Sequence, residues 1–185
     1  MQTISRWIYK IIGWKAVSTV VEPSKSVIIV APHTSNWDFV IGKFFYWILG
    51  RKSSFLMKKS WFFFPLGLLL RGMGGVAVDR SKRTSVTDQI AAEFNMHETF
   101  HVAITPEGTR KPVKKWKMGF YHIAVKANVP IQLGYIDYAK KEMGITEIFF
   151  PTGDENADMI KIHAFYKSVT ARHPEDFINK NETDE

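Results

Sequence analysis

Hydrophobic residues between positions 3 and 12 recur with the spacing of one face of an α-helix, and basic residues occupy other positions on the helical wheel. The apolar set comprises Ile4, Trp7, Ile8, Ile11 and Ile12. We therefore expect an amphipathic helix within residues 1–15, with Thr3 as its N-cap. Such a helix can anchor a protein at a lipid surface, and it can equally pack on the protein's own core.

Further along the chain, short runs typical of strands are separated by longer stretches with helical periodicity. The predicted strands cover residues 26–30, 53–57, 76–78, 100–104, 129–135 and 145–150, and the predicted helices cover residues 36–49, 61–70, 85–96, 117–127 and 156–169. This alternation indicates an α/β fold with a central, mostly parallel or mixed sheet flanked by helices. Because no repeat or linker divides the chain, we expect a single domain over residues 1–185 with a polar, frayed tail at 174–185.

The composition is that of an ordinary globular protein with a surplus of positive charge. The 185 residues are 45% hydrophobic and 23% charged, with a formal net charge of +7 and no cysteine. Without cysteine the chain has no disulfide, thiolate metal ligand or cysteine nucleophile. The positive charge favours a polyanionic partner. Because the aromatic residues gather in apolar runs such as 44–47 and 61–64, the pattern favours an anionic membrane surface over nucleic acid.

The expected relation to that membrane is peripheral. A spanning helix needs roughly 18 consecutive apolar residues, whereas the run at 61–70 contains Pro65 and stops at Arg71. Basic residues interrupt the N-terminal region, which therefore lacks the apolar core of a secretory signal. We expect a cytoplasmic protein bound to the cytoplasmic face of a membrane.

The strand predicted at 26–30 leads into a loop that carries His33 and, five residues later, Asp38. An aspartate that accepts a proton from one imidazole nitrogen leaves the other nitrogen free to take a proton from an attacking hydroxyl. This spacing indicates a general-base pair. The spacing also arises easily by chance, so its meaning depends on the rest of the chain.

Two later segments each place an arginine just beyond a predicted strand, Arg80 after 76–78 and Arg110 after 100–104. Ends of parallel strands gather at one edge of an α/β sheet, where guanidinium groups can bind a phosphate through forked hydrogen bonds. Each arginine could equally form a surface salt bridge. Lys58, after the strand at 53–57, could add positive charge near the same site or be solvated.

With these segments in this order, the sequence resembles the glycerolipid acyltransferase family, typified by 1-acylglycerol-3-phosphate acyltransferase, over about residues 26–135. His33 and Asp38 match the family's catalytic pair. The second block is matched by Gly74, Val76, Val78 and Arg80, the third by Glu107 and Gly108 in a segment that continues through Thr109 and Arg110, and the fourth by Val129, Pro130 and Ile131. The resemblance implies that the second and third blocks bind the glycerol and phosphate region of the acceptor, and that the fourth lies near the acyl chain.

The resemblance therefore implies an acyltransferase. Its donor would be acyl-coenzyme A or acyl carrier protein, and its acceptor a hydroxyl of a lysophospholipid or glycerol-phosphate-type molecule. His33 would act as the base in direct transfer, because Ser35 has no base of its own to make it a nucleophile. We expect no cofactor and no metal ion.

Two alternatives remain. Residues 97–101 spell H-E-x-x-H, the zinc-binding pattern of metalloproteases, which requires both histidines on one helical face. Because residues 100–104 alternate as a strand, His97 and His101 should diverge. The second alternative is a non-catalytic lipid-binding module, against which the His33–Asp38 pair and the two arginine-bearing loops argue.

Overall fold

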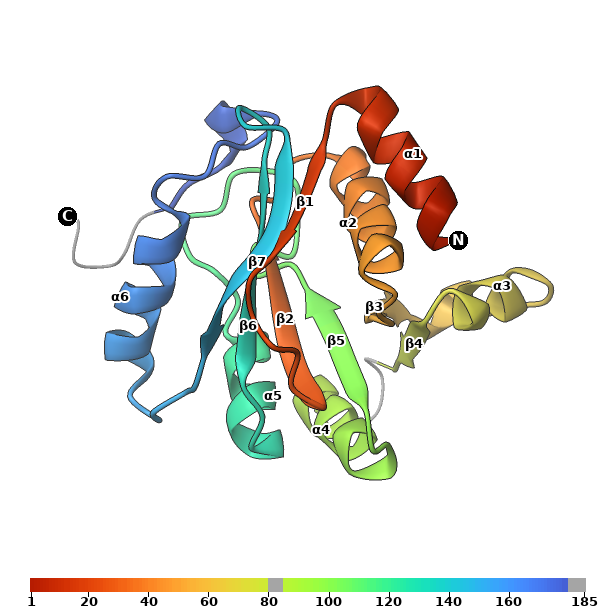
Figure 1. The fold of residues 1–185 in the computed structure, drawn as a ribbon. Helices are drawn as coiled ribbons and strands as arrows, with labels where there is room; N and C mark the ends of the chain where they lie inside the picture. Colours follow the sequence, from red (N-terminus) through yellow and green to blue (C-terminus); the bar gives the residue numbers. More distant parts are fainter. Residues whose placement is uncertain (80–84, 180–185) are drawn as a thin grey trace.

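In the computed structural model, which describes residues 1–79 and 85–179, seven strands form one sheet in the order β1-β7-β6-β2-β5-β3-β4 (Figure 1). The strands are β1 Lys15–Ser18, β2 Lys25–Ala31, β3 Ser54–Lys58, β4 Gly75–Val78, β5 Phe100–Ile104, β6 Ile131–Asp137 and β7 Glu142–Phe149. All neighbours are parallel except β6 and β7, which pair antiparallel. The expected α/β fold with a mostly parallel sheet is confirmed.

Helices cover both faces of this sheet, because successive side chains of a strand point to opposite sides. The helices are α1 Gln2–Ile12, α2 Asn36–Leu49, α3 Leu66–Gly72, α4 Val86–Met96, α5 Gly119–Ala127 and α6 Glu155–Tyr166, with short 3-10 turns η1 Lys59–Trp61 and η2 Pro174–Asp176. Val27 and Ile29 of β2 join the core beneath α4, α5 and α6. Ile28 and Val30 join the core beneath α1 and α2. The central strand is thus buried on both sides, as its continuous apolar run requires.

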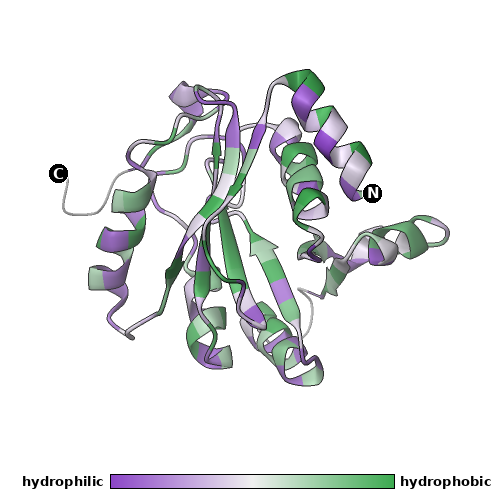
Figure 2. Ribbon diagram, viewed as in Figure 1, coloured by the Kyte–Doolittle hydropathy of each residue, from purple (hydrophilic) through white to green (hydrophobic). Residues whose placement is uncertain are grey.

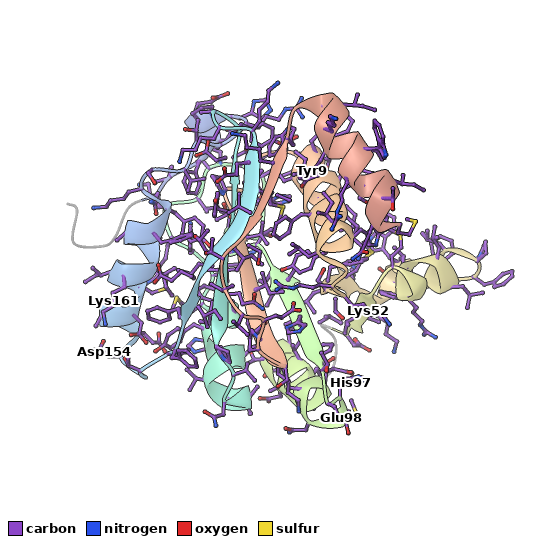
Figure 3. The ribbon with its side chains drawn as sticks, viewed as in Figure 1. Tyr9, Lys52, His97, Glu98, Asp154 and Lys161 are labelled. Atoms are coloured by element: carbon purple, nitrogen blue, oxygen red, sulfur yellow. The ribbon has the colours of Figure 1, made fainter. Side chains whose placement is uncertain are left out.

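Helix α1 packs against α2 through a face that differs from its apolar stripe. Ser5 and Tyr9 are buried, and the Tyr9 hydroxyl donates to the Ile41 carbonyl of α2 at 2.7 Å. Figure 3 labels Tyr9 beside the upper part of α2. Trp7 and Ile11, by contrast, are 61% and 79% exposed. The stripe predicted from the sequence therefore faces outward. No helix within the described residues is long and apolar enough to cross a membrane.

Four details differ from the elements expected from sequence. Helix α1 begins at Gln2 without a side-chain cap, so Thr3 lies inside it. The apolar stretch 61–70 is helical only from Leu66, after an irregular segment that ends at Pro65. Strand β1 was missed because its four residues are partly exposed and show no clear alternation, and it forms through pairing with β7. Of the tail expected to fray, residues 174–176 form η2, and residues 180–185 lie outside the described part.

Candidate active site

The carboxyl ends of β2 and β5 bring two of the predicted segments together. The strands are parallel neighbours, so the loops that follow them leave the sheet at the same edge. His33 follows β2, and Glu107 follows β5. The backbone N–H of His33 donates to Glu107 Oε1 at 2.9 Å. Residues 74 positions apart in the sequence are thereby joined at one site.

The predicted pair of His33 and Asp38 is in contact. His33 Nδ1 lies 3.2 Å from Asp38 Oδ2. Asp38 occupies the first turn of α2, where its Oδ2 also accepts the N–H groups of Thr34 at 2.9 Å and Ser35 at 2.8 Å. Ser35 is the N-cap of α2 and forms a capping box with Asp38. The Asp38 carboxylate therefore both caps the helix and contacts the His33 imidazole. The second oxygen, Oδ1, accepts the Tyr138 hydroxyl at 2.6 Å.

Glu107 is a buried acid beside this pair. Its side chain is 5% exposed, and Oε2 has no hydrogen-bond partner among the described residues. Burial disfavours the charged form and raises the pKa of Glu107 to about 7, although the backbone N–H groups of Glu107 and His33 oppose that rise. Glu107 therefore titrates near neutral pH and supports the His33 backbone through Oε1 in either form.

A cavity of about 540 Å³ opens beside His33. This volume lies within the range of roughly 300–1,000 Å³ that is usual for small-ligand sites. Its polar lining includes His33, Asn36, Asp38, Lys43 and Lys117. Its apolar lining includes Val30, Phe39, Phe55, Leu56, Ile104, Phe120, Ile123 and Met143. The histidine thus meets a space whose walls suit a hydrocarbon chain.

Two positively charged side chains near the cavity differ in their exposure and in their hydrogen-bond partners. Arg110, in the loop after β5, is exposed and donates to Asn36 Oδ1, whose residue lines the cavity. Lys43 is partly buried and donates to the carbonyls of Ser53 and Met73, and burial lowers its pKa. Arg110 therefore lies at the edge of the cavity, while the Lys43 amine is engaged by backbone.

Lys117 is a cavity-lining cation that the sequence reasoning missed. Its side chain lies over Gly108, because a Cβ built at Gly108 would come within 2.6 Å of Lys117 Nζ. Gly108 also has φ +65°, a conformation that favours glycine. The predicted Gly108 thus lines the cavity and makes room for the lysine. Lys117 lies nine residues further on, in no motif that would have singled it out.

Other predicted site residues lie away from the pair. Lys58 is exposed at the end of β3, and the Thr109 hydroxyl accepts the N–H of Lys111 at 3.3 Å; neither residue lines the cavity. Gly74 directly precedes the edge strand β4, three strands along from β2, and its carbonyl accepts the N–H of Phe55. Arg80 lies outside the described residues.

The fourth block lies at the amino end of β6, away from the loop that carries His33. Pro130 accepts the N–H of Val27, and Ile131 pairs with Val27 in the sheet. From there to Ala31, at the end of β2, is about 13 Å at the usual rise per residue. Val129 and Ile131 are buried in the core, and none of the three lines the cavity. Whether Val129–Ile131 borders the acyl chain stays a prediction.

The H-E-x-x-H segment has the divergent geometry expected of it. His97 ends α4 in an extended conformation, and with Glu98 it lies at the start of β5 (Figure 3). His101 is buried in β5, and its Nδ1 lies 2.8 Å from Ser26 Oγ. That hydroxyl also accepts from Gln132, so His101 Nδ1 is part of a buried hydrogen-bond chain within the sheet. Burial lowers the pKa of His101 to about 4, and neither histidine belongs to a metal-binding group among the described residues.

Comparisons with known proteins agree with this fold and identify a family. A family model described as Acyltransferase matches residues 16–133, more than half of the 185-residue chain. The chain is similar to the crystal structure of the 1-acyl-sn-glycerophosphate (LPA) acyltransferase PlsC from Thermotoga maritima, with 18% identity and a TM-score of 0.59. The match covers 92% of this chain and 80% of that chain, and at this identity it shows a shared fold. No curated protein gave a significant match. The chain therefore belongs to the Acyltransferase family.

Proposed function

We propose that this acyltransferase moves a fatty acyl group from acyl-coenzyme A or acyl carrier protein to a hydroxyl of a lysophospholipid or glycerol-phosphate-type acceptor. The observation that carries the proposal is the contact between His33 and Asp38 at the wall of a largely apolar cavity. A positioned base supplies the proton transfer that acyl transfer to a hydroxyl needs, and the apolar walls suit a fatty chain.

In the proposed reaction His33 is the general base. Asp38 lies at Nδ1, so Nε2 is the nitrogen that takes the proton of the acceptor hydroxyl as its oxygen attacks the thioester carbonyl. The Asp38 carboxylate stabilises the imidazolium that forms. Collapse of the tetrahedral intermediate breaks the carbon–sulfur bond, and the departing thiolate receives the proton from His33. The products are an ester and a free thiol, and no acyl-enzyme is formed.

The cations beside the cavity are the proposed contacts for the anionic group of the acceptor. Arg110 offers a forked set of donors at the edge of the cavity, next to Asn36. Lys117 adds a second positive charge from the same connection between β5 and α5, above Gly108. The acyl chain would then lie along the apolar walls formed by α2, β3 and α5.

An anionic membrane surface is the proposed partner that presents the acceptor, and the cytoplasmic face is the proposed location. Helix α1 and the segment around α3 lie on the same side of the molecule as α2 (Figures 1 and 2). Both carry exposed apolar side chains. They are Ile4, Trp7, Ile11, Trp61, Phe63, Phe64, Leu68 and Leu69. Exposed basic residues accompany them at Arg6, Lys10, Lys59 and Arg71. Apolar and aromatic side chains flanked by basic ones are typical of interfacial segments.

The test is turnover by purified protein with radiolabelled acyl-coenzyme A or acyl carrier protein against a panel of lysophospholipid and glycerol-phosphate acceptors. His33→Ala and Asp38→Ala should each lower kcat on the order of a hundredfold or more. His122→Ala is the matched control, because this exposed histidine on α5 contacts Glu155 and lies outside the cavity. Lipid binding without transfer to any acceptor would favour a non-catalytic lipid-binding module instead.

A further inference from the structure

The two oxygens of the Asp38 carboxylate have separate partners. Oδ2 faces His33 Nδ1 and the backbone N–H groups of its own loop, whereas Oδ1 accepts only the hydroxyl of Tyr138 among the hydrogen bonds seen. Tyr138 follows β6, beyond the segment that the family model matches, and lies 100 residues from Asp38 in the sequence. Asp38 is 3% exposed, so without this hydroxyl Oδ1 would be a buried charged oxygen with no protein donor.

The tyrosine ring is itself held from several directions. The ring of Trp14 packs edge-on against it, with centroids 5.0 Å apart. The backbone N–H of Tyr138 donates to the Thr170 carbonyl at 2.9 Å, and the Arg172 guanidinium lies 5.9 Å from both the Tyr138 and the Trp37 ring centroids. Burial raises the pKa of Tyr138, so its hydroxyl keeps its proton and can act as a donor. The hydroxyl therefore reaches Asp38 from a rigid support.

We propose that Tyr138 is a positioning residue for the acyl transfer, whose hydroxyl fixes the rotation of the Asp38 carboxylate so that Oδ2 faces His33. The inference rests on the proposed function of the His33–Asp38 pair. The last torsion of an aspartate side chain is broad and roughly two-fold, so a bond to Oδ1 restricts it. Two backbone N–H groups already donate to Oδ2, as part of the capping box of α2. The helix end is therefore satisfied without the tyrosine, and the third donor satisfies Oδ1 and fixes the orientation of the carboxylate.

The chain contains a matched control for this interaction. Tyr121 of α5 donates its hydroxyl to Asp158 Oδ2 at 2.8 Å, and Asp158 also accepts the N–H and the hydroxyl of Thr152. This is the same chemical pair, a tyrosine hydroxyl on a buried first-turn aspartate of a helix. Neither Tyr121 nor Asp158 lines the cavity. The Tyr121 hydroxyl also accepts the N–H of Gly153 at 3.1 Å, so Tyr121→Phe reports the effect of losing at least one such bond away from the site.

The experiment measures steady-state kinetics of Tyr138→Phe, Tyr121→Phe, Asp38→Ala and the double variant Tyr138→Phe/Asp38→Ala, with the acyl-coenzyme A and lysophospholipid that the wild type turns over. Tyr138→Phe should lower kcat about ten- to a hundredfold, the range of one charge-assisted hydrogen bond, with KM for both substrates within about twofold. Tyr121→Phe should keep wild-type kcat within about twofold, while urea unfolding shows a comparable loss of stability. In the Asp38→Ala background, Tyr138→Phe should cause no further loss, because the tyrosine acts through the carboxylate.

Three results would overturn the inference: wild-type kcat in Tyr138→Phe, an equal loss of kcat in Tyr121→Phe, or fully additive losses in the double variant. Each of these leaves the large effect of His33→Ala in place, so the proposed function survives. Near-normal turnover by His33→Ala is a different result, which removes the proposed function and this inference together.

Discussion

The buried acid beside His33 makes stability depend on pH in a way that one substitution can remove. Glu107→Gln keeps an oxygen that can accept the His33 N–H and replaces an ionisable group by one of the same shape that cannot lose a proton. The pKa of Glu107 is raised from its ordinary value of 4.5 to about 7, chiefly because the side chain is buried. The free energy of unfolding of the variant should therefore differ most from that of the wild type at the pH values where the wild-type carboxyl is charged.

The expected size follows from the shift in pKa. The difference between 7 and 4.5 is 2.5 units, which at 1.36 kcal/mol per unit is at most about 3 kcal/mol. Between these two pH values the folded protein holds a proton that the unfolded chain has lost, so the free energy of unfolding of the wild type falls as pH rises and levels off above about pH 7. The glutamine variant lacks this contribution. Its stability relative to the wild type should rise by up to about 3 kcal/mol from pH 5 to pH 8.

Urea unfolding followed by tryptophan fluorescence at pH 5, 6, 7 and 8 measures this difference. Subtracting wild type from variant at each pH cancels the contribution of other groups, such as the buried His101, that both proteins share. Glu147→Gln is the control, because that carboxylate is exposed on β7 and belongs to none of the ion pairs seen among the described residues, so its substitution should give a difference that does not change with pH. If the Glu107→Gln difference is equally flat from pH 5 to pH 8, the buried acid with a raised pKa is refuted.

Three further predictions address the acceptor, the membrane and the absence of zinc. Arg110→Ala should reduce the preference for a phosphorylated acceptor over its dephosphorylated analogue by about ten- to a hundredfold in kcat/KM, and Arg110→Lys should restore little of it; equal losses with both acceptors would argue against a phosphate contact. Phe64→Ser, at an 82% exposed position, should weaken sedimentation with vesicles of phosphatidylglycerol and phosphatidylcholine several-fold, whereas Met96→Ser at the end of α4 should not. A strong chelator should leave turnover unchanged, and elemental analysis should find far less than one zinc per chain, because His97 and His101 diverge; stoichiometric zinc would contradict that reading.

Local sequence information determined the parts of the site that lie close together in the chain. Ser35 and Asp38 stand at the spacing of a helix cap, and His33 precedes them in the same loop, so their contact needs only the strand-to-helix turn that the hydrophobic pattern predicts. The alternation of residues 100–104 likewise sufficed to place His101 in a strand. The meeting of the loops after β2 and β5 followed from the general rule for parallel sheets.

Contacts between distant segments were decided by the tertiary structure. Glu107 accepts the N–H of His33, which is 74 positions away in the sequence. Tyr138 donates to Asp38, which is 100 positions away. The fourth block, Val129–Ile131, lies at the opposite edge of the sheet from His33. Hydrophobic periodicity reports which face of an element is buried, but strand order and register decide which side chains meet. Neither the partner of Asp38 Oδ1 nor the place of the fourth block could be read before the sheet was known.

In the N-terminal helix, too, the sequence determined one property and the tertiary structure another. Its sequence determined an apolar stripe, and left open whether protein or lipid covers it. In the folded chain Ser5 and Tyr9 face α2 while Trp7 and Ile11 face outward, because the Tyr9 hydroxyl reaches the Ile41 carbonyl. The pattern of a helix specifies an apolar face, whereas the surface available on its neighbours decides which face packs against them.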